Sequence, residues 1–189
     1  MSFILSAALL VAVVVVRPDA AAIVRVPEDF RSVQAAVDAA PDGGVVILAK
    51  GVHLGPVNMR GKSVTLKGEW GAEFTSLLGG DGVIQCMSGE GPSTVIEGLS
   101  IVGGEGWLGE DGLRRGGGVY IDGASPVLRR CMIVGNEADR GAAVWLRGGV
   151  PLFEDCWFHD NMSEQTDGVV CEGTAPKFIR CGFHEDGVQ

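Results

Sequence analysis

Two histidines stand 25 residues apart near the end of the chain, each followed by side chains that bind metals or protons. His159 precedes Asp160, and His184 precedes Glu185. Imidazole and carboxylate groups bind divalent metals, and imidazole also transfers protons near neutral pH. These four residues are therefore a candidate metal or acid–base site. The alternative is a turn decorated by a stacked ladder of Asn136, Asn161 and Asp186.

Charged residues recur at the same interval. Asp122, Arg147 and Glu172 follow one another 25 residues apart. In a polysaccharide lyase, such acids would bind calcium while the arginine removes a proton from a uronate. The alternative is a column of alternating charges that fixes the register of stacked strands, in which each exposed pair contributes little to stability.

Aromatic residues form a third candidate group. Tyr120 and Trp145 share the 25-residue interval, as do Met132 and Trp157. Exposed rings on neighbouring strands offer stacking surfaces to sugar rings. We therefore expect carbohydrate binding at Tyr120, Trp145 and Trp157. Alternatively, the glycine-rich segment 105–115, which contains Trp107, folds over one of these rings.

The interval belongs to a repeat that extends from about residue 116 to residue 186. Prolines, cysteines and glycines recur in it with one period, which is typical of a solenoid. The three copies read GGGVYIDGASPVLRRCMIVGN at 116–136, GAAVWLRGGVPLFEDCWFHDN at 141–161 and TDGVVCEGTAPKFIRCGFHED at 166–186.

Each copy contains three short runs of alternating character, such as Val119 to Asp122, Val127 to Arg129 and Cys131 to Val134. Runs this short do not form helices, but stacked three to a turn they make a triangular coil. The prediction is an all-β solenoid, a single-stranded parallel β-helix of about five coils. The composition agrees, because 30 glycines among 189 residues suit many short strands and turns.

Alternation along the runs assigns the interior. Cys131, Cys156 and Cys181 form one inner column, where free thiols fill space as small hydrophobic groups. A bridge between rungs stays open, although stacked residues in parallel strands rarely meet disulfide geometry. Further inner columns are Val119, Val144 and Val169; Ile121, Leu146 and Cys171; Leu128, Phe153 and Phe178; and Ile133, Phe158 and Phe183.

The earlier part of the chain predicts a cap and further coils. Pro27 and the two acids after it favour a first helical turn, so we expect a helix over about 27–40 that covers the first rung. Val45 to Leu48 and Val64 to Lys67 are predicted strands of the first coils. The segment 105–115 is then an insertion that loops out of one coil.

The first residues predict export. Ile4 to Val16 is an apolar run, and Ala20 and Ala22 suit a signal peptidase, although no Lys or Arg stands at the start. We expect a signal peptide at 1–22 and a β-helix domain at 23–189 that is secreted, periplasmic or on the cell surface, with no transmembrane span in the mature chain. An uncleaved anchor or a buried first strand is the alternative. The net charge of −9 argues against nucleic-acid partners.

These residues resemble the pectin-lyase-like superfamily. SVQAAVDAAPDGGVVILAKGVH at 32–53 is similar to the entry segment of pectin methylesterases, and the 116–136 copy resembles the repeats of polymorphic outer-membrane proteins. The resemblance implies a right-handed parallel β-helix. The Gly-His-Gly and paired-Asp motifs of polygalacturonases and the catalytic Gln and Asp segments of pectin methylesterases are absent. Arg147 and Gly148 stand where pectate lyases have Asp-His, so no catalytic residue is carried over.

The leading hypothesis is a noncatalytic scaffold that presents its outward columns to a glycan or a surface protein and needs no cofactor. A polysaccharide lyase, glycoside hydrolase or esterase is the second hypothesis, with calcium as a possible cofactor of a lyase. The third is an assembly joined end to end through the last coil, because no capping helix is predicted after residue 186.

Overall fold

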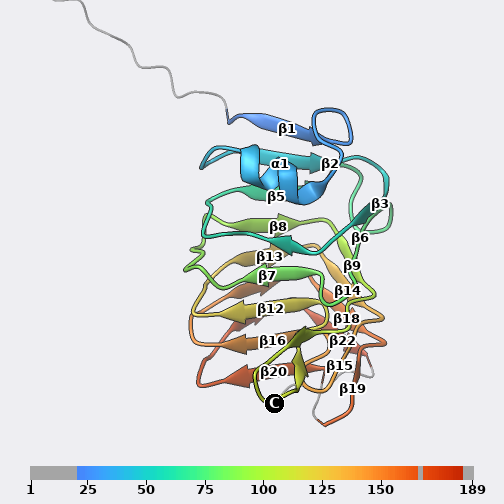
Figure 1. Cartoon of the computed structure of the whole chain (residues 1–189), viewed down its shortest axis with the longest axis vertical. Coiled ribbons are helices and arrows are strands. Elements are labelled where there is room, and N and C mark those ends of the chain that lie inside the picture. Colours follow the sequence, from blue (N-terminus) through green and yellow to red (C-terminus); the bar gives the residue numbers. More distant parts are fainter. Residues whose placement is uncertain (1–20, 166–167, 185–189) are drawn as a thin grey trace, which may run out of the picture.

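The computed structural model describes residues 21–165 and 168–184, which wind into a stack of short parallel strands (Figure 1). The strands form three long sheets, named here sheets I, II and III. Sheet I contains β1 (Ile23–Val26), β2 (Val45–Leu48), β5 (Thr65–Gly68), β8 (Val95–Glu97), β13 (Val127–Arg129), β17 (Leu152–Glu154) and β21 (Lys177–Ile179). Sheet II contains β3 (Gly51–Leu54), β6 (Thr75–Leu78), β9 (Ser100–Val102), β14 (Met132–Val134), β18 (Trp157–His159) and β22 (Gly182–His184). Sheet III contains β4 (Val57–Asn58), β7 (Ile84–Cys86), β12 (Val119–Asp122), β16 (Val144–Arg147) and β20 (Val169–Glu172).

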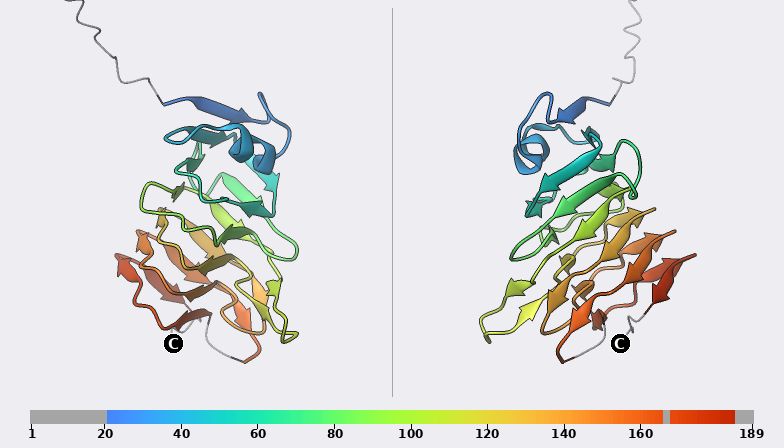
Figure 2. Two further views of the ribbon diagram at one scale, coloured as in Figure 1. Left: turned by 60° about the vertical axis from the view of Figure 1, so that its left-hand side comes forward. Right: turned by 90° about the vertical axis from the view of Figure 1, so that its right-hand side faces the viewer.

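The chain visits sheets I, II and III in turn, coil after coil, and the fold is a right-handed parallel β-helix. Five coils are complete, from β2–β3–β4 to β17–β18–β20, and strands of incomplete coils lie before and after them. The prediction of about five coils is thereby confirmed. Figure 2 shows the strands of sheet II stacked as one side of the solenoid.

The 25-residue register of the repeats is confirmed strand by strand. Val119 pairs with Val144 and Val144 with Val169, Leu128 pairs with Phe153, and Ile133 with Phe158. The predicted inner side chains of the first two copies are fully buried, whereas Phe178 and Phe183 in the last described strands are half-buried. Stacked phenylalanines extend this interior, with 4.7 Å between the ring centroids of Phe158 and Phe183.

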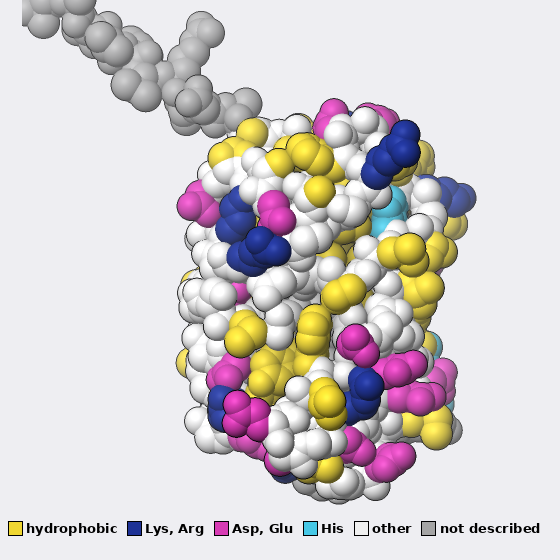
Figure 3. Space-filling view, in the orientation of Figure 1, with side chains coloured by type: hydrophobic (Ala, Val, Ile, Leu, Met, Phe, Trp, Pro, Cys, Tyr) yellow, Lys and Arg dark blue, Asp and Glu magenta, His cyan; other side chains and the backbone are white. Residues whose placement is uncertain are grey.

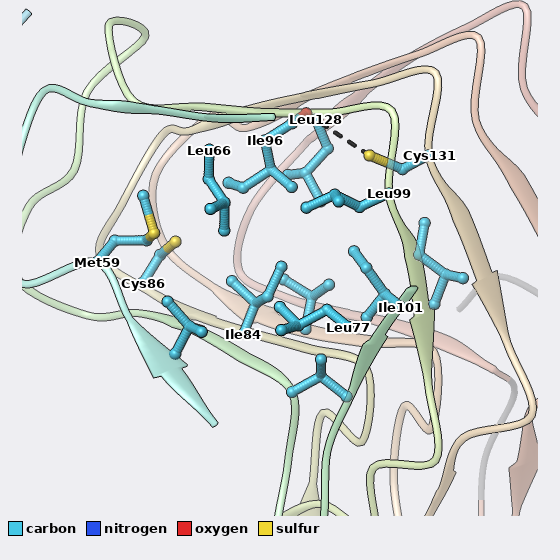
Figure 4. Packing of buried hydrophobic residues seen from close by; sticks show 14 of the residues in the cluster. Met59, Leu66, Leu77, Ile84, Cys86, Ile96, Leu99, Ile101, Leu128 and Cys131 are labelled. Atoms are coloured by element: carbon cyan, nitrogen blue, oxygen red, sulfur yellow. Dashed lines mark hydrogen bonds between the residues drawn. The ribbon is translucent and has the colours of Figure 1, made fainter. Parts of the chain in front are cut away.

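The cysteine column also lies as predicted. Cys131 and Cys156 are buried and Cys181 is half-buried, and all three thiols are free. The thiol of Cys131 donates a hydrogen bond to the carbonyl oxygen of Ile96 at 3.6 Å (Figure 4). Contact with Cys131 raises the pKa of the Cys156 thiol, as burial also does. The column therefore fills space between the sheets.

The N-terminal helix forms, but its predicted start is wrong. Helix α1 spans Val33–Ala39, and the Ser32 hydroxyl caps it by accepting a bond from the backbone N–H of Ala35 at 3.2 Å. Residues 27–29 form a turn instead. The backbone N–H of Arg25 donates to the Asp29 carboxylate, and the backbone N–H of Asp29 donates to the Arg25 carbonyl. The first strand, β1, precedes the helix and adds to sheet I, while α1 covers the start of sheet III, where the Gln34 side chain exchanges hydrogen bonds with the backbone of Asn58 on β4 (Figure 1).

Two small pairs of strands project from the coils. The predicted insertion at 105–115 is an antiparallel hairpin of β10 (Trp107–Leu108) and β11 (Arg114–Arg115). It lies between β9 of sheet II and β12 of sheet III. The second pair, β15 (Glu137–Ala138) and β19 (Met162–Ser163), is parallel and lies in the same connection of the next two coils.

Candidate functional site

A groove of about 700 Å³ runs between the outer face of sheet III and the hairpin. The hairpin supplies one wall and the outward side chains of β7, β12, β16 and β20 supply the floor. Figure 3 shows hydrophobic side chains beside acidic and basic ones on the face where these strands lie. The residues that line the groove include Gln85, Leu108, Asp111, Arg115, Tyr120, Trp145, Arg147 and Glu172.

Tyr120 and Trp145 meet at the floor of the groove. They are register partners, and their rings stack with 4.7 Å between the centroids. Trp145 is nevertheless only 2% exposed, so the expectation that it offers an open platform is wrong. The guanidinium groups of Arg115 and Arg147 lie over its ring, at 5.9 and 5.5 Å from the centroid. Tyr120 is half-buried and still lines the groove.

The alternative prediction for these rings is confirmed, because the insertion does cover one of them. Arg115, at the end of the hairpin, is held by two hydrogen bonds to the carboxylate of Asp111. These bonds lower the pKa of the Asp111 carboxyl. The pair keeps the Arg115 side chain extended over Trp145.

The predicted charge column of sheet III is present and in register. Arg147 donates to both carboxylate oxygens of Asp122, at 3.1 and 2.5 Å. Glu172 is the next register partner, but its carboxylate pairs with Arg140 at 3.0 Å. The bonds to Asp122 raise the pKa of Arg147. Burial, followed by the negative charge of Asp122, raises the pKa of Tyr120.

The two histidines lie on a different side of the solenoid. His159 and His184 are register partners at the outer face of sheet II. They line a separate hollow of about 690 Å³ together with Trp157, Met132 and Glu73. Trp157 is therefore separated from Tyr120 and Trp145, because the three predicted carbohydrate-binding residues lie on two sheets.

The structure describes three of the four residues predicted for the histidine cluster: His159, Asp160 and His184. The Nδ1 atom of His159 lies 3.0 Å from a carboxylate oxygen of Asp160, and Glu185 lies outside the described residues. Over 21–165 and 168–184, no three His, Cys, Asp or Glu side chains come together as metal ligands.

The alternative interpretation of this turn, an asparagine ladder, is confirmed for two of its members. Asn136 and Asn161 are buried, and Asn136 Nδ2 donates to Asn161 Oδ1 at 2.8 Å. Each amide also donates to a backbone carbonyl of the preceding coil, which satisfies polar groups in the bend. Asp186 lies outside the described residues.

Sequence reasoning missed several residues of the groove. Gln85 is the register partner of Tyr120, but it stands 35 residues earlier, because the hairpin interrupts the 25-residue period. Asp111 and Leu108 lie on the hairpin, whose position over sheet III no spacing reveals. The long gap between Val102 and Tyr120 was the available signal that something projects there.

The described part of the chain has no helix long and apolar enough to cross a membrane. No protein-family model and no curated protein matches the sequence. Solved structures do match it.

The three long parallel sheets and the likeness to solved structures define a right-handed parallel β-helix. The similar structures are pectin methylesterases. One is a variant in complex with hexasaccharide IV, with a TM-score of 0.64 at 15% identity, and another is in complex with hexasaccharide VII, with 0.61 at 16%. PemA from Erwinia chrysanthemi has a TM-score of 0.58 at 16% identity.

In each comparison the match covers 86% of this chain and 54% of the other, so the chain spans about half the length of these enzymes. At such identities the likeness shows the fold.

Proposed function

We propose that this protein is an extracytoplasmic β-helix that binds an oligosaccharide in the groove of sheet III without cleaving it. The observation that carries the proposal is the groove itself. Its volume of about 700 Å³ suits several sugar units, and an aromatic ring lies on its floor. Pectin methylesterases with the same fold are known in complex with hexasaccharides, which supports a saccharide as the ligand.

The floor of the groove combines a ring with hydrogen-bonding groups. Trp145 packs on Tyr120, so the phenol ring is held in one orientation within the groove. Gln85, Arg147 and Glu172 surround it and can donate to or accept from sugar hydroxyls. Stacking on a fixed ring costs little conformational entropy, which favours binding.

The ionic contacts of the groove favour binding over catalysis. A uronate lyase would require Arg147 to act as a base, but Asp122 raises the pKa of Arg147 and occupies its guanidinium. Glu172, the third member of the column, is bound to Arg140. Each group is already neutralised by a partner within the protein.

A polysaccharide lyase, hydrolase or esterase is the second candidate, supported by the fold shared with pectin methylesterases. Incubation with polygalacturonate, methylated pectin and alginate, with and without calcium, separates the two. Binding without release of unsaturated uronides, shorter oligosaccharides or methanol supports the proposal. Release of any of these products, if Arg147→Ala abolishes it, would show that the protein is an enzyme and would overturn the proposal of binding without cleavage.

Calorimetric titration with pectin-derived hexasaccharides tests the binding site. We expect Tyr120→Ala to weaken binding roughly tenfold, because it removes the ring from the floor. Trp70→Ala is the matched control, since Trp70 is an exposed aromatic residue that does not line the groove. Equal affinities for wild type and Tyr120→Ala would contradict the proposed site.

We also propose that the chain is exported from the cytoplasm and that copies of it associate through the last coil. Fractionation of a cell that expresses the full chain tests export. Light scattering over a concentration series tests association through the last coil, and a monomer at every concentration would argue against it.

A further inference from the structure

Trp157 projects from the outer face of sheet II, where 56% of its surface is exposed. Its register partner on β22 is Gly182. A Cβ atom on Gly182 would lie 2.6 Å from Cε3 and Cζ3 of the indole and 2.8 Å from Cη2. The six-membered ring therefore lies across the backbone of the next strand, in space that a glycine leaves open. One face of the indole is packed against the sheet and the opposite face is turned outward.

The strand positions around this ring are uncharged, and the charged side chains near it, Glu73 and Asp160, lie on connections beside the sheet. Two outward columns extend along sheet II through its described strands, and neither contains Asp, Glu, Lys or Arg. Sheets I and III both place ion pairs at their outward positions, such as Arg129 with Glu97 and Arg147 with Asp122. The columns are Val52, Ser76, Ser100, Met132, Trp157 and Gly182, and Leu54, Leu78, Val102, Val134, His159 and His184.

Polar groups lie along one edge of the ring. His159 and His184 are two residues after Trp157 and Gly182 on the same strands, so both imidazoles face the same side of the sheet. Nδ1 of His159 is engaged by Asp160, which orients the ring. An imidazole both donates and accepts hydrogen bonds, as a sugar hydroxyl requires. Glu73 stands at the rim of the hollow and is exposed.

We propose that this hollow of about 690 Å³ is a second ligand site, which binds an uncharged pyranose stacked on Trp157. The apolar face of the sugar lies on the indole, and its hydroxyls bind the histidines. An uncharged ligand suits this hollow, because neither column has a Lys or Arg to pair with a carboxylate, and the charged side chains beside it, Glu73 and Asp160, are acidic. This site is independent of the groove on sheet III, which lies on another side of the solenoid.

The test is a titration of the full chain with neutral gluco-, manno- and galacto-oligosaccharides and with uronate oligosaccharides. We expect a neutral sugar to bind and Trp157→Ala to weaken it roughly tenfold or more. Trp157→Leu keeps an apolar side chain over Gly182 but has no ring on which a sugar can stack. We therefore expect it to weaken binding as much as Trp157→Ala does. Tyr120→Ala should leave this binding unchanged. Gly182→Val, which forces the indole off the strand, should weaken it even though Trp157 is present.

Three results would overturn the second site. The first is the absence of binding by every neutral sugar. The second is neutral-sugar binding that falls with Tyr120→Ala and not with Trp157→Ala, which would leave the groove as the sugar site. The third is a concentration-dependent dimer that Trp157→Leu dissociates, with no sugar bound, which would make the face a contact between protein chains. If Tyr120→Ala loses uronate binding and Trp157→Ala does not, that result concerns the groove on sheet III and does not test the Trp157 site.

Discussion

Trp145 and Trp157 belong to one sequence repeat, 141–161, and both point outward, yet one is 2% exposed and the other 56%. Trp145 lies on β16 in sheet III beneath two guanidinium groups, whereas Trp157 lies on β18 in sheet II over a glycine. Alternation along a strand decides only the direction of a side chain. The connections between strands decide whether something covers it.

The difference between the two sheets comes from the length of these connections. Only two residues separate β13 from β14 and only two separate β17 from β18, so in these coils the corner between sheets I and II holds nothing that could cover Trp157. The connection from sheet II to sheet III is longer, and it holds the hairpin that carries Arg115 over Trp145. Sheet III therefore has a walled groove, and sheet II has an open face.

The largest effect should come from truncating the covered ring. We expect Trp145→Ala to lower the free energy of unfolding by about 3–5 kcal/mol, because it removes a buried aromatic side chain. Trp157→Ala should lower it by less than about 1 kcal/mol, since the ring is mostly in water. Urea denaturation of both variants measures the contrast. Equal losses of unfolding free energy in the two variants would contradict the contrast between a buried Trp145 and an exposed Trp157.

A smaller effect is expected at Glu97, a third outward residue, whose side chain is 5% exposed. Burial alone would raise its pKa, but hydrogen bonds from Lys67, Arg130 and Arg129 outweigh burial and lower the pKa from 4.5 to about 2. Because the folded-state pKa is lowered, the stabilisation is present above pH 4.5 and is lost as the pH falls toward 2.

We expect Glu97→Gln to cost about 1–3 kcal/mol near neutral pH and to flatten the acid limb of a stability profile. Unfolding measured between pH 2 and pH 7 tests this expectation. A wild-type profile that is flat over this range would show that the carboxylate gains nothing from its three cations.

The smallest effect concerns the cover itself. Arg115→Ala removes one guanidinium from the Trp145 ring and should cost about 1 kcal/mol. It should also shift the tryptophan emission to longer wavelength as water reaches the indole. Arg180→Ala is the control, because Arg180 pairs with Glu154 and Asp155 rather than with a ring. An unchanged emission spectrum in Arg115→Ala would show that the hairpin does not shield Trp145.

The interior was predictable because one period governs it. Stacked positions such as Leu128 and Phe153 repeat every 25 residues, and the alternation of two then fixes which side chains are inside. The charge column of Asp122 and Arg147 followed from the same count. A sequence period of this kind maps directly onto stacked positions in the structure, because each coil contacts mainly its neighbours.

The groove was less predictable because its walls break the period. Arg115 and Asp111 lie in an insertion that occurs in one coil, so no repeat indicates where they fold. The start of α1 was misplaced because a local contact competes with the helix: Arg25 and Asp29 exchange hydrogen bonds and close residues 27–29 into a turn directly after β1.

The central claim is that the groove between the hairpin and sheet III binds a saccharide. Titration of wild type and Tyr120→Ala with pectin-derived hexasaccharides tests this claim most directly, with circular dichroism to show that both chains are folded. We predict saturable binding to wild type and a roughly tenfold loss in the variant. Saturable binding of equal strength to both proteins, or no binding to wild type, would contradict it.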